Sequence, residues 1–265
     1  MTSPSLISLN GITKSFSNGT VALRDMSMDV KRGEFVSLLG PSGCGKSTAL
    51  RIIAGLAPAT LGTVTWDQSG SADSSASHSH DISFVFQEPT LMPWATVFGN
   101  VYLPLKLKGK SKAASRDEVM EALELVGLEN FENSYPRELS GGMKMRVSIA
   151  RALVTRPRLL LMDEPFAALD EITRFKLNND LLHLWERFNW TVIFVTHSVF
   201  ESVYLSNRIV VMAARPGRVV EDMTIDVPYP RDEDFRTSQI YSDHCRTVSA
   251  ALHNAMDANE SEQIA

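Results

Sequence analysis

Short apolar runs recur along this chain with helical patterns between them, and this alternation limits its fold more than any other feature. The runs are "EFVSLLG" (34–40), "ISFVFQ" (82–87), "LLLMDE" (159–164), "TVIFVTH" (191–197) and "RIVVMA" (208–213). Short continuous apolar runs bounded by turn residues are typical of strands that are buried on both faces. The sequence therefore predicts an α/β fold with a parallel sheet wrapped by helices. Nearer the start, "LISLNGITKSF" and "VALRDMSMDV" alternate more and predict an antiparallel edge.

The composition is that of an ordinary soluble globular chain. Its 265 residues are 44% hydrophobic and 22% charged, which allows a large core and one or two sub-domains. The formal net charge is −5, and residues 231–265 alone carry seven acids and three bases. The rest of the chain is therefore nearly neutral, which argues against a broad nucleic-acid surface. We expect no nucleic-acid partner.

Cysteine usage and hydropathy indicate where such a chain works. Cys44 and Cys245 lie far apart in the sequence, so we expect no disulfide and a reducing compartment. The first residues show no basic and no apolar signal region, so we expect no export. The longest stretch without a charge, 89–105, is interrupted by three prolines and is shorter than the ~20 apolar residues of a spanning helix. Any link to a membrane is expected to go through a partner.

The middle of the chain has a different, helical character. "SRDEVMEALELVGL" (115–128) places Val119, Leu123 and Val126 at helical spacing. We expect a helical sub-domain at about 88–156, inserted into a main domain at 1–230. An acidic C-terminal extension would follow at 231–265.

A serine-rich tract lies upstream of that sub-domain. Residues 67–81 contain six serines and almost nothing apolar, a composition that favours a flexible surface loop. His78 and His80 lie within this tract and receive no metal-binding role, because histidines in such a loop are normally solvated.

The segment "GPSGCGKST" (40–48), which we call the P-loop, matches the pattern G-x-x-x-x-G-K-[ST]. An apolar strand precedes it, and "STALRIIAGL" (47–56) continues as a helix with Leu50, Ile53 and Leu56 expected to face inward. Glycines allow backbone N–H groups to wrap phosphates, and Lys46 supplies a positive charge for them. The Ser47 hydroxyl can bind Mg²⁺. Cys44 is expected to be only a small residue of the loop, not a nucleophile.

A second chemical motif is "LLLMDEP" (159–165), in which an apolar strand delivers two carboxylates at its carboxyl end. Ligands sit at the carboxyl ends of strands in open parallel sheets. Asp163 is predicted to hold Mg²⁺, directly or through water. Glu164, pointing the other way on an extended chain, is placed to polarise an attacking water.

A second anion-binding element is predicted at "ELSGGMKMRVSIARAL" (138–153), which reads as a helix. Ser140 is a suitable N-cap, and Gly141 and Gly142 leave backbone N–H groups bare at the positive end of the helix. The P-loop, about a hundred residues upstream, already provides one phosphate-binding site, so the purpose of a second anion-binding site needs an explanation.

Together these segments resemble the ATP-binding-cassette ATPases, from about Leu6 to Pro230. The resemblance implies a P-loop NTPase (RecA-like) core with an antiparallel β edge and an inserted α-helical sub-domain, and it implies ATP hydrolysis with Mg²⁺. In that family "LSGGMKMR" (139–146) corresponds to the signature motif, which binds the γ-phosphate of ATP held by the other copy of a head-to-tail dimer. Each nucleotide is thus clamped between two chains, which explains why one chain carries two anion sites.

The resemblance assigns further residues one at a time. Phe16 matches the aromatic that stacks on adenine, although the family more often has Tyr there. Gln87 matches the residue that contacts Mg²⁺ or the attacking water, and Asp170 matches the loop that crosses the dimer interface. His197 matches the switch histidine that contacts the γ-phosphate. The residues expected to bind ATP phosphates are Gly40, Pro41, Ser42, Gly43, Cys44, Gly45, Lys46, Ser47 and Thr48.

Two residues depart from the family pattern. Met145 stands where many members have Gln; it lies beyond the N–H groups of the signature, so we expect an adjustment and no loss of function. Ala167 replaces a frequent Gly, which should be tolerated if its φ is negative.

The segments 86–105, 163–174 and 214–231 resemble a subgroup that serves bacterial importers of nitrate, sulfonate, taurine and pyrimidine precursors. That implies a separate membrane permease, indirectly a solute-binding protein, and a peripheral position on the cytoplasmic face of the inner membrane. Leu91, Met92, Pro93 and Trp94 would form an apolar docking surface for the permease. Burial of Trp94 inside the helical sub-domain is the alternative.

Other functions are compatible with parts of the pattern. A soluble cassette ATPase of DNA repair or translation would lack a permease, but such proteins usually split the motifs with a coiled coil or carry two cassettes. A P-loop kinase would leave the signature helix unexplained. An exporter usually fuses cassette and membrane domain in one chain. The transported solute cannot be inferred from these residues.

Overall fold

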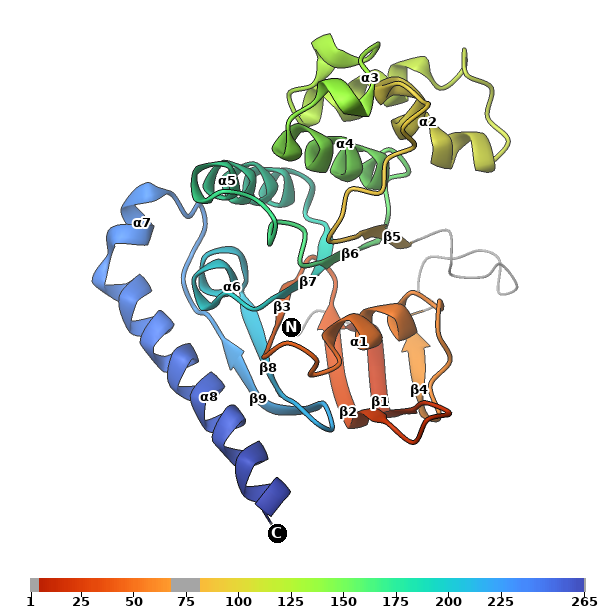
Figure 1. Cartoon of the computed structure of the whole chain (residues 1–265). Coiled ribbons are helices and arrows are strands. Elements are labelled where there is room, and N and C mark those ends of the chain that lie inside the picture. Colours follow the sequence, from red (N-terminus) through yellow and green to blue (C-terminus); the bar gives the residue numbers. More distant parts are fainter. Residues whose placement is uncertain (1–4, 68–81, 265) are drawn as a thin grey trace. The chain divides into compact units, whose positions relative to one another are not determined.

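The computed structural model describes residues 5–67 and 82–264, apart from the side chains beyond residue 256. These residues form two compact units, one made of 5–67 with 189–264 and the other of 82–188. We call them the P-loop unit and the signature unit and describe each by itself (Figure 1). Except for Asp67, the serine-rich tract with His78 and His80 lies outside the described residues.

A parallel group of strands forms the centre of the P-loop unit. β3 (Phe35–Leu39) pairs in parallel with both β7 (Thr191–Thr196) and β8 (Arg208–Ala213). All residues of β3 and β7 are buried, as expected for apolar runs covered on both faces. β9 (Arg218–Thr224) adds an antiparallel edge beside β8. The predicted buried parallel strands are therefore confirmed in this unit.

The first strands form a separate sheet in the same unit. β1 (Ser5–Ser15) lies between β2 (Val21–Lys31) and β4 (Leu61–Trp66), and both pairings are antiparallel. The antiparallel pairing of β1 with β2 agrees with the alternation in their sequences. β4 was not predicted, because most of its residues are exposed and it lacks a buried apolar face.

The helix after the P-loop, α1 (Lys46–Ile53), is shorter than predicted. Leu50 and Ile53 are buried, as expected, but Leu56 is 64% exposed. The prediction that Leu56 faces inward is wrong, because the helix ends at Ile53 and Gly55 adopts a left-handed φ of 70°. A glycine in this conformation commonly terminates a helix.

Three helices complete the P-loop unit after β7. They are α6 (Val199–Leu205), α7 (Glu233–Thr237) and α8 (Gln239–Ile264). α8 contacts both α6 and β8, and α6 contacts β3 and β7 (Figure 1). The C-terminal helices therefore pack on the same core as the P-loop strand.

The signature unit has one parallel strand pair and several helices. β5 (Ile82–Val85) pairs with β6 (Leu159–Asp163). The α-helices are α2 (Val97–Leu107), α3 (Arg116–Leu125), α4 (Gly141–Leu153) and α5 (Glu171–Phe188), and the 3₁₀ turns are η2 (Glu129–Phe131) and η3 (Pro136–Glu138). Val119, Leu123 and Val126 are buried, as their helical spacing predicted.

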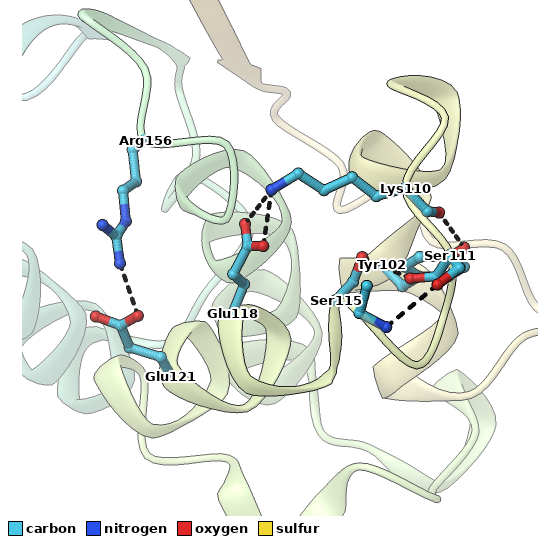
Figure 2. A network of polar contacts seen from close by, with 8 residues as sticks. Tyr102, Lys110, Ser111, Ser115, Glu118, Glu121 and Arg156 are labelled. Carbon is cyan, nitrogen blue, oxygen red and sulfur yellow. Dashed lines mark hydrogen bonds and ion pairs between the residues drawn. The ribbon is translucent and has the colours of Figure 1, made fainter.

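Polar contacts fix the connection between α2 and α3 (Figure 2). The Tyr102 hydroxyl donates to the carbonyl of Lys110 at 2.7 Å, and the Lys110 ammonium binds the Glu118 carboxylate at 2.7 and 2.9 Å. Arg156, beyond α4, reaches Glu121 of α3 at 2.8 Å. Exposed pairs contribute little stability each, so we read these contacts as fixing the orientation of the helices.

No helix in the described part of the chain combines the length and the apolar character needed to cross a membrane.

Candidate functional site

The P-loop connects the end of β3 to the start of α1, and its backbone requires glycine at two positions. Gly45 has a φ of 91°, and a Cβ there would lie 2.7 Å from the carbonyl oxygen of Ala22. A Cβ on Gly40 would lie 2.6 Å from the carbonyl oxygen of Met212. Such distances are too short for a side chain, so the loop can close tightly only with glycine here.

The side chain of Lys46 lies inside the curve of the P-loop. Its ammonium donates hydrogen bonds to the carbonyl oxygens of Gly40 at 2.8 Å and Pro41 at 3.0 Å, and the residue is buried. The loop therefore surrounds a positive charge at the N-terminus of α1. A helix N-terminus with an adjacent cation favours a phosphate group.

Cys44 lies within the same loop and is fully buried. Burial raises the pKa of its thiol, because the thiolate would lose its hydration; the nearby Lys46 only partly offsets this effect. The thiol therefore stays protonated at neutral pH. This agrees with the prediction that Cys44 is not a nucleophile.

His197 follows β7 at the edge of the sheet where the P-loop begins. Leu39 at the end of β3 is in register with Thr196 at the end of β7, so Gly40 and His197 follow neighbouring strands at the same edge. His197 is exposed. The P-loop unit thus brings together the predicted phosphate loop and the predicted switch histidine.

Phe16 lies just after β1 in the turn to β2, and its ring is 47% exposed. The Lys14 ammonium lies 5.5 Å from the ring centroid and donates to the Pro58 carbonyl at 2.7 Å. The ring is therefore not part of the core. An exposed ring face is available for stacking on a base.

In the signature unit, β5 and β6 bring the predicted catalytic side chains to one edge. Val85 is in register with Met162, so Gln87 and Asp163 lie at the carboxyl ends of adjacent strands. Gln87 is exposed, and Asp163 and Glu164 are half-buried. These are oxygen-bearing groups, of the kind that Mg²⁺ prefers.

The backbone at Glu164 differs from the prediction. We expected an extended chain, but β6 ends at Asp163 and Glu164 has a left-handed φ of 46°. The chain therefore turns at Glu164, and the Glu164 carbonyl accepts the N–H of Ala167 at 3.2 Å. Non-glycine residues rarely adopt this conformation, and where they do the strain is often found at a functional site. Ala167 itself is not among the described residues with positive φ, which fits its tolerance in place of Gly.

The signature helix α4 begins as predicted, with Ser140 as its N-cap. The Ser140 hydroxyl oxygen accepts the N–H of Met143 at 3.2 Å. A Cβ on Gly142 would lie 2.6 Å from the side chain of Thr173 on α5, whereas one on Gly141 would make only ordinary contact with Leu169 at 3.5 Å. Packing against α5 therefore requires glycine at 142, while Gly141 is exposed and leaves its N–H accessible.

Asp170 lies at the start of α5. Its carboxylate accepts the N–H of Thr173 at 2.9 Å, and this hydrogen bond lowers the pKa of the carboxyl group. The same two elements, α4 and α5, thus carry the signature glycines and Asp170. The interface role of Asp170 stays a prediction.

Two residues that support the site were not singled out from the sequence. A Cβ on Gly217 would lie 2.0 Å from the Cys44 carbonyl oxygen, so this glycine lets the P-loop rest on the β8–β9 turn. Arg151 of α4 donates to the carbonyls of Thr90 at 2.9 Å and Pro89 at 2.8 Å, just beyond Gln87. The Pro216–Gly217 pair indicates a turn, but neither distant contact has a local sequence signal.

The ABC transporter family matches residues 23–167. The chain belongs to this family. The match covers the P-loop, the signature segment and the carboxylates Asp163 and Glu164 at the end of β6, so the predicted cassette fold and ATPase class are confirmed. The remaining site residues stay predictions.

Curated relatives extend this likeness over most of the chain. An uncharacterized ABC transporter ATP-binding protein of Methanocaldococcus jannaschii is 48% identical over 85% of this chain and 84% of its own length. The aliphatic sulfonates import ATP-binding protein SsuB of Bacillus cereus is 44% identical over 88% of this chain and 91% of its own length.

A solved cassette dimer in a post-hydrolysis state, bound to ADP and Pi, superposes with a TM-score of 0.72 at 36% identity, covering 84% of this chain and all of that chain. This cassette is therefore an ATP-binding and ATP-hydrolysing protein of the ABC transporter family.

Proposed function

We propose that this chain is the ATP-hydrolysing subunit of an ABC importer and energises uptake of a small solute through a separate permease. The solute class would be nitrate, sulfonate, taurine or a pyrimidine precursor. The relatives named for aliphatic sulfonate import, at 44% and 45% identity over 91% of their length, support the importer subgroup. The cassette would lie on the cytoplasmic face of the inner membrane as a peripheral subunit, with a solute-binding protein acting outside.

Each site residue receives a role in ATP binding or hydrolysis. The P-loop residues bind the phosphates, and Phe16 stacks on the adenine. Glu164 polarises the attacking water, and His197 contacts the γ-phosphate. Ser47, Gln87 and Asp163 would hold Mg²⁺, and their hydroxyl, amide and carboxylate oxygens fit this hard cation. When bound, Mg²⁺ neutralises charge on the phosphate oxygens.

We further propose that two copies of the chain enclose each ATP head-to-tail. The N–H groups after Ser140, at Gly141 and Gly142, would bind the γ-phosphate of the ATP on the other copy, and Asp170 would lie at the interface. The exposed Gly141 and the bare start of α4 support this proposal. Because both clamps need nucleotide, the dimer is a switch that ATP closes and hydrolysis reopens.

The observation that carries the importer proposal is the exposure of Trp94. Trp94 is 77% exposed, so it is not buried inside the helical segment, which was the alternative. Pro93 is also exposed, and Leu91 and Met92 are half-buried. An exposed tryptophan beside other apolar groups is typical of a protein–protein contact. This surface, Leu91–Trp94, would receive the permease.

Co-expression with a candidate importer permease tests the proposal. Wild-type cassette should co-purify with the permease in detergent, whereas Trp94→Glu should lose the permease and keep its own ATPase. Leu107→Glu is a matched control, because Leu107 is equally exposed, at 79%, on the same unit. Equal capture of both variants would refute docking at Trp94, and no capture of wild type would favour a soluble ABC ATPase of repair or translation.

A further inference from the structure

The helix α6 starts two residues after the predicted switch residue His197, with Ser198 as its N-cap, and polar contacts tie both neighbours of His197 to its first turn. The Thr196 hydroxyl donates to the Glu201 carboxylate at 2.6 Å and accepts the N–H of Ser198 at 3.0 Å. The Ser198 hydroxyl oxygen in turn accepts the N–H of Glu201 at 3.3 Å. Both neighbours of His197 are therefore bonded to the first turn of α6. A shift of α6 would move the His197 backbone with it.

The C-terminal helix α8 holds the first turn of α6. The Tyr241 hydroxyl donates to the carbonyl oxygen of Phe200 at 3.0 Å, and Tyr241 is only 8% exposed. Its ring packs edge-on against Phe235 of α7 at a centroid distance of 5.2 Å. Burial raises the pKa of the Tyr241 phenol, so it remains a hydrogen-bond donor.

Arg231, before α7, holds the other end of α6. Its guanidinium donates to the carbonyls of Val203 at 2.8 Å, Tyr204 at 3.1 Å and Ser206 at 2.8 Å. Arg231 is 1% exposed, and the Tyr204 hydroxyl donates back to its carbonyl at 2.8 Å. The last carbonyls of a helix lack intrahelical donors, and a cation is favourable there. The buried Arg231 thus fixes the C-terminal end of α6.

We propose that the segment from Arg231 to Tyr241 is a clamp on α6 that positions His197 for its contact with the γ-phosphate, with Tyr241 as the positioning residue. This inference rests on the proposed role of His197. The clamp grips α6 at both ends, and α8 lies beside α6 and β8 in the P-loop unit (Figure 1). The start of the acidic C-terminal extension would then support hydrolysis through α6.

The test is the steady-state ATPase of the full chain as Tyr241→Phe, which removes one hydroxyl and keeps the ring. We expect kcat to fall about fivefold, which corresponds to ~1 kcal/mol in the barrier, with the KM for ATP nearly unchanged and with no larger loss of Tm than Tyr102→Phe shows. Tyr102→Phe is the matched control, because the Tyr102 hydroxyl also donates to a backbone carbonyl, that of Lys110 at 2.7 Å, in the other unit (Figure 2).

A double-mutant cycle with His197→Ala separates positioning from general stability. In single-turnover assays, Tyr241→Phe should cost nothing further once His197 is absent, and amide exchange of residues 198–202 should be faster in Tyr241→Phe than in Tyr102→Phe. Equal kcat in Tyr241→Phe and Tyr102→Phe would overturn the clamp. Additive effects of Tyr241→Phe and His197→Ala on the single-turnover rate would also overturn the clamp. An ATPase rate of His197→Ala equal to that of wild type would instead overturn the proposed role of His197. The clamp would then have no role in hydrolysis.

Discussion

The ammonium of Lys46 lies 2.8 Å from the carbonyl oxygen of Gly40 at the other end of the P-loop. The loop is thus closed around its own cation. The same charge can turn to the phosphate oxygens, so the chain holds a preorganised anion site. The loop geometry and the phosphate-binding charge depend on one side chain.

Lys46→Met tests this double role. The substitution keeps much of the side-chain volume but removes the charge, so we expect ATP affinity to fall about 100-fold, or about 3 kcal/mol. Equilibrium binding of a fluorescent ATP analogue measures the change. An affinity within about twofold of wild type would show that Lys46 does not bind the nucleotide.

Gly217→Ala tests the support behind the P-loop. The new Cβ would lie 2.0 Å from the Cys44 carbonyl oxygen, so the loop must move, and we expect a loss of ATP affinity of about tenfold together with a lower Tm. Gly19→Ala is the comparison, because a Cβ there meets nothing within 4 Å and only its left-handed φ is strained. If both variants bind ATP as tightly as wild type, the contact between Gly217 and the loop has no functional weight.

Ser140→Ala separates the two roles of the signature serine, which are capping α4 and contacting the ATP of the second copy. Losing the N-cap should cost about 1 kcal/mol of stability, and losing the contact to the second copy should lower hydrolysis without lowering ATP affinity in the monomer. Thr96→Ala removes a comparable cap, since Thr96 accepts the N–H of Gly99 at 3.2 Å at the start of α2. We expect it to match Ser140→Ala in stability and wild type in turnover. A large loss of ATP affinity in isolated Ser140→Ala monomers would contradict binding across the dimer.

The apolar runs predicted the buried strands well, because a strand that is buried on both faces consists of consecutive apolar residues. β3 and β7 are buried throughout, and Ser140 caps α4 as its position suggested. β4 and β9 were missed because each is partly exposed and has no continuous apolar run.

The remaining errors and omissions arise from backbone conformation and from distant contacts. The inward placement of Leu56 did not take account of the helix termination before Gly55. The left-handed φ of Glu164 could not be predicted, because Glu is not a residue type that favours positive φ. Burial of Arg231 depends on the carbonyls of residues 203, 204, 206 and 227. An arginine in an acidic tail normally indicates a solvated position, so no sequence argument would place it in a core.

The measurement that tests the central claim most directly is the oligomeric state of the Glu164→Gln variant with and without ATP. Glutamine keeps the shape of the side chain but cannot act as a base, so turnover should fall at least about 100-fold, or about 3 kcal/mol in the barrier, while ATP still binds.

Light scattering of Glu164→Gln should then show a dimer with ATP and Mg²⁺ and a monomer without nucleotide. A variant that stays monomeric at saturating ATP, or that hydrolyses ATP at nearly the wild-type rate, would contradict the account in which two copies enclose each nucleotide.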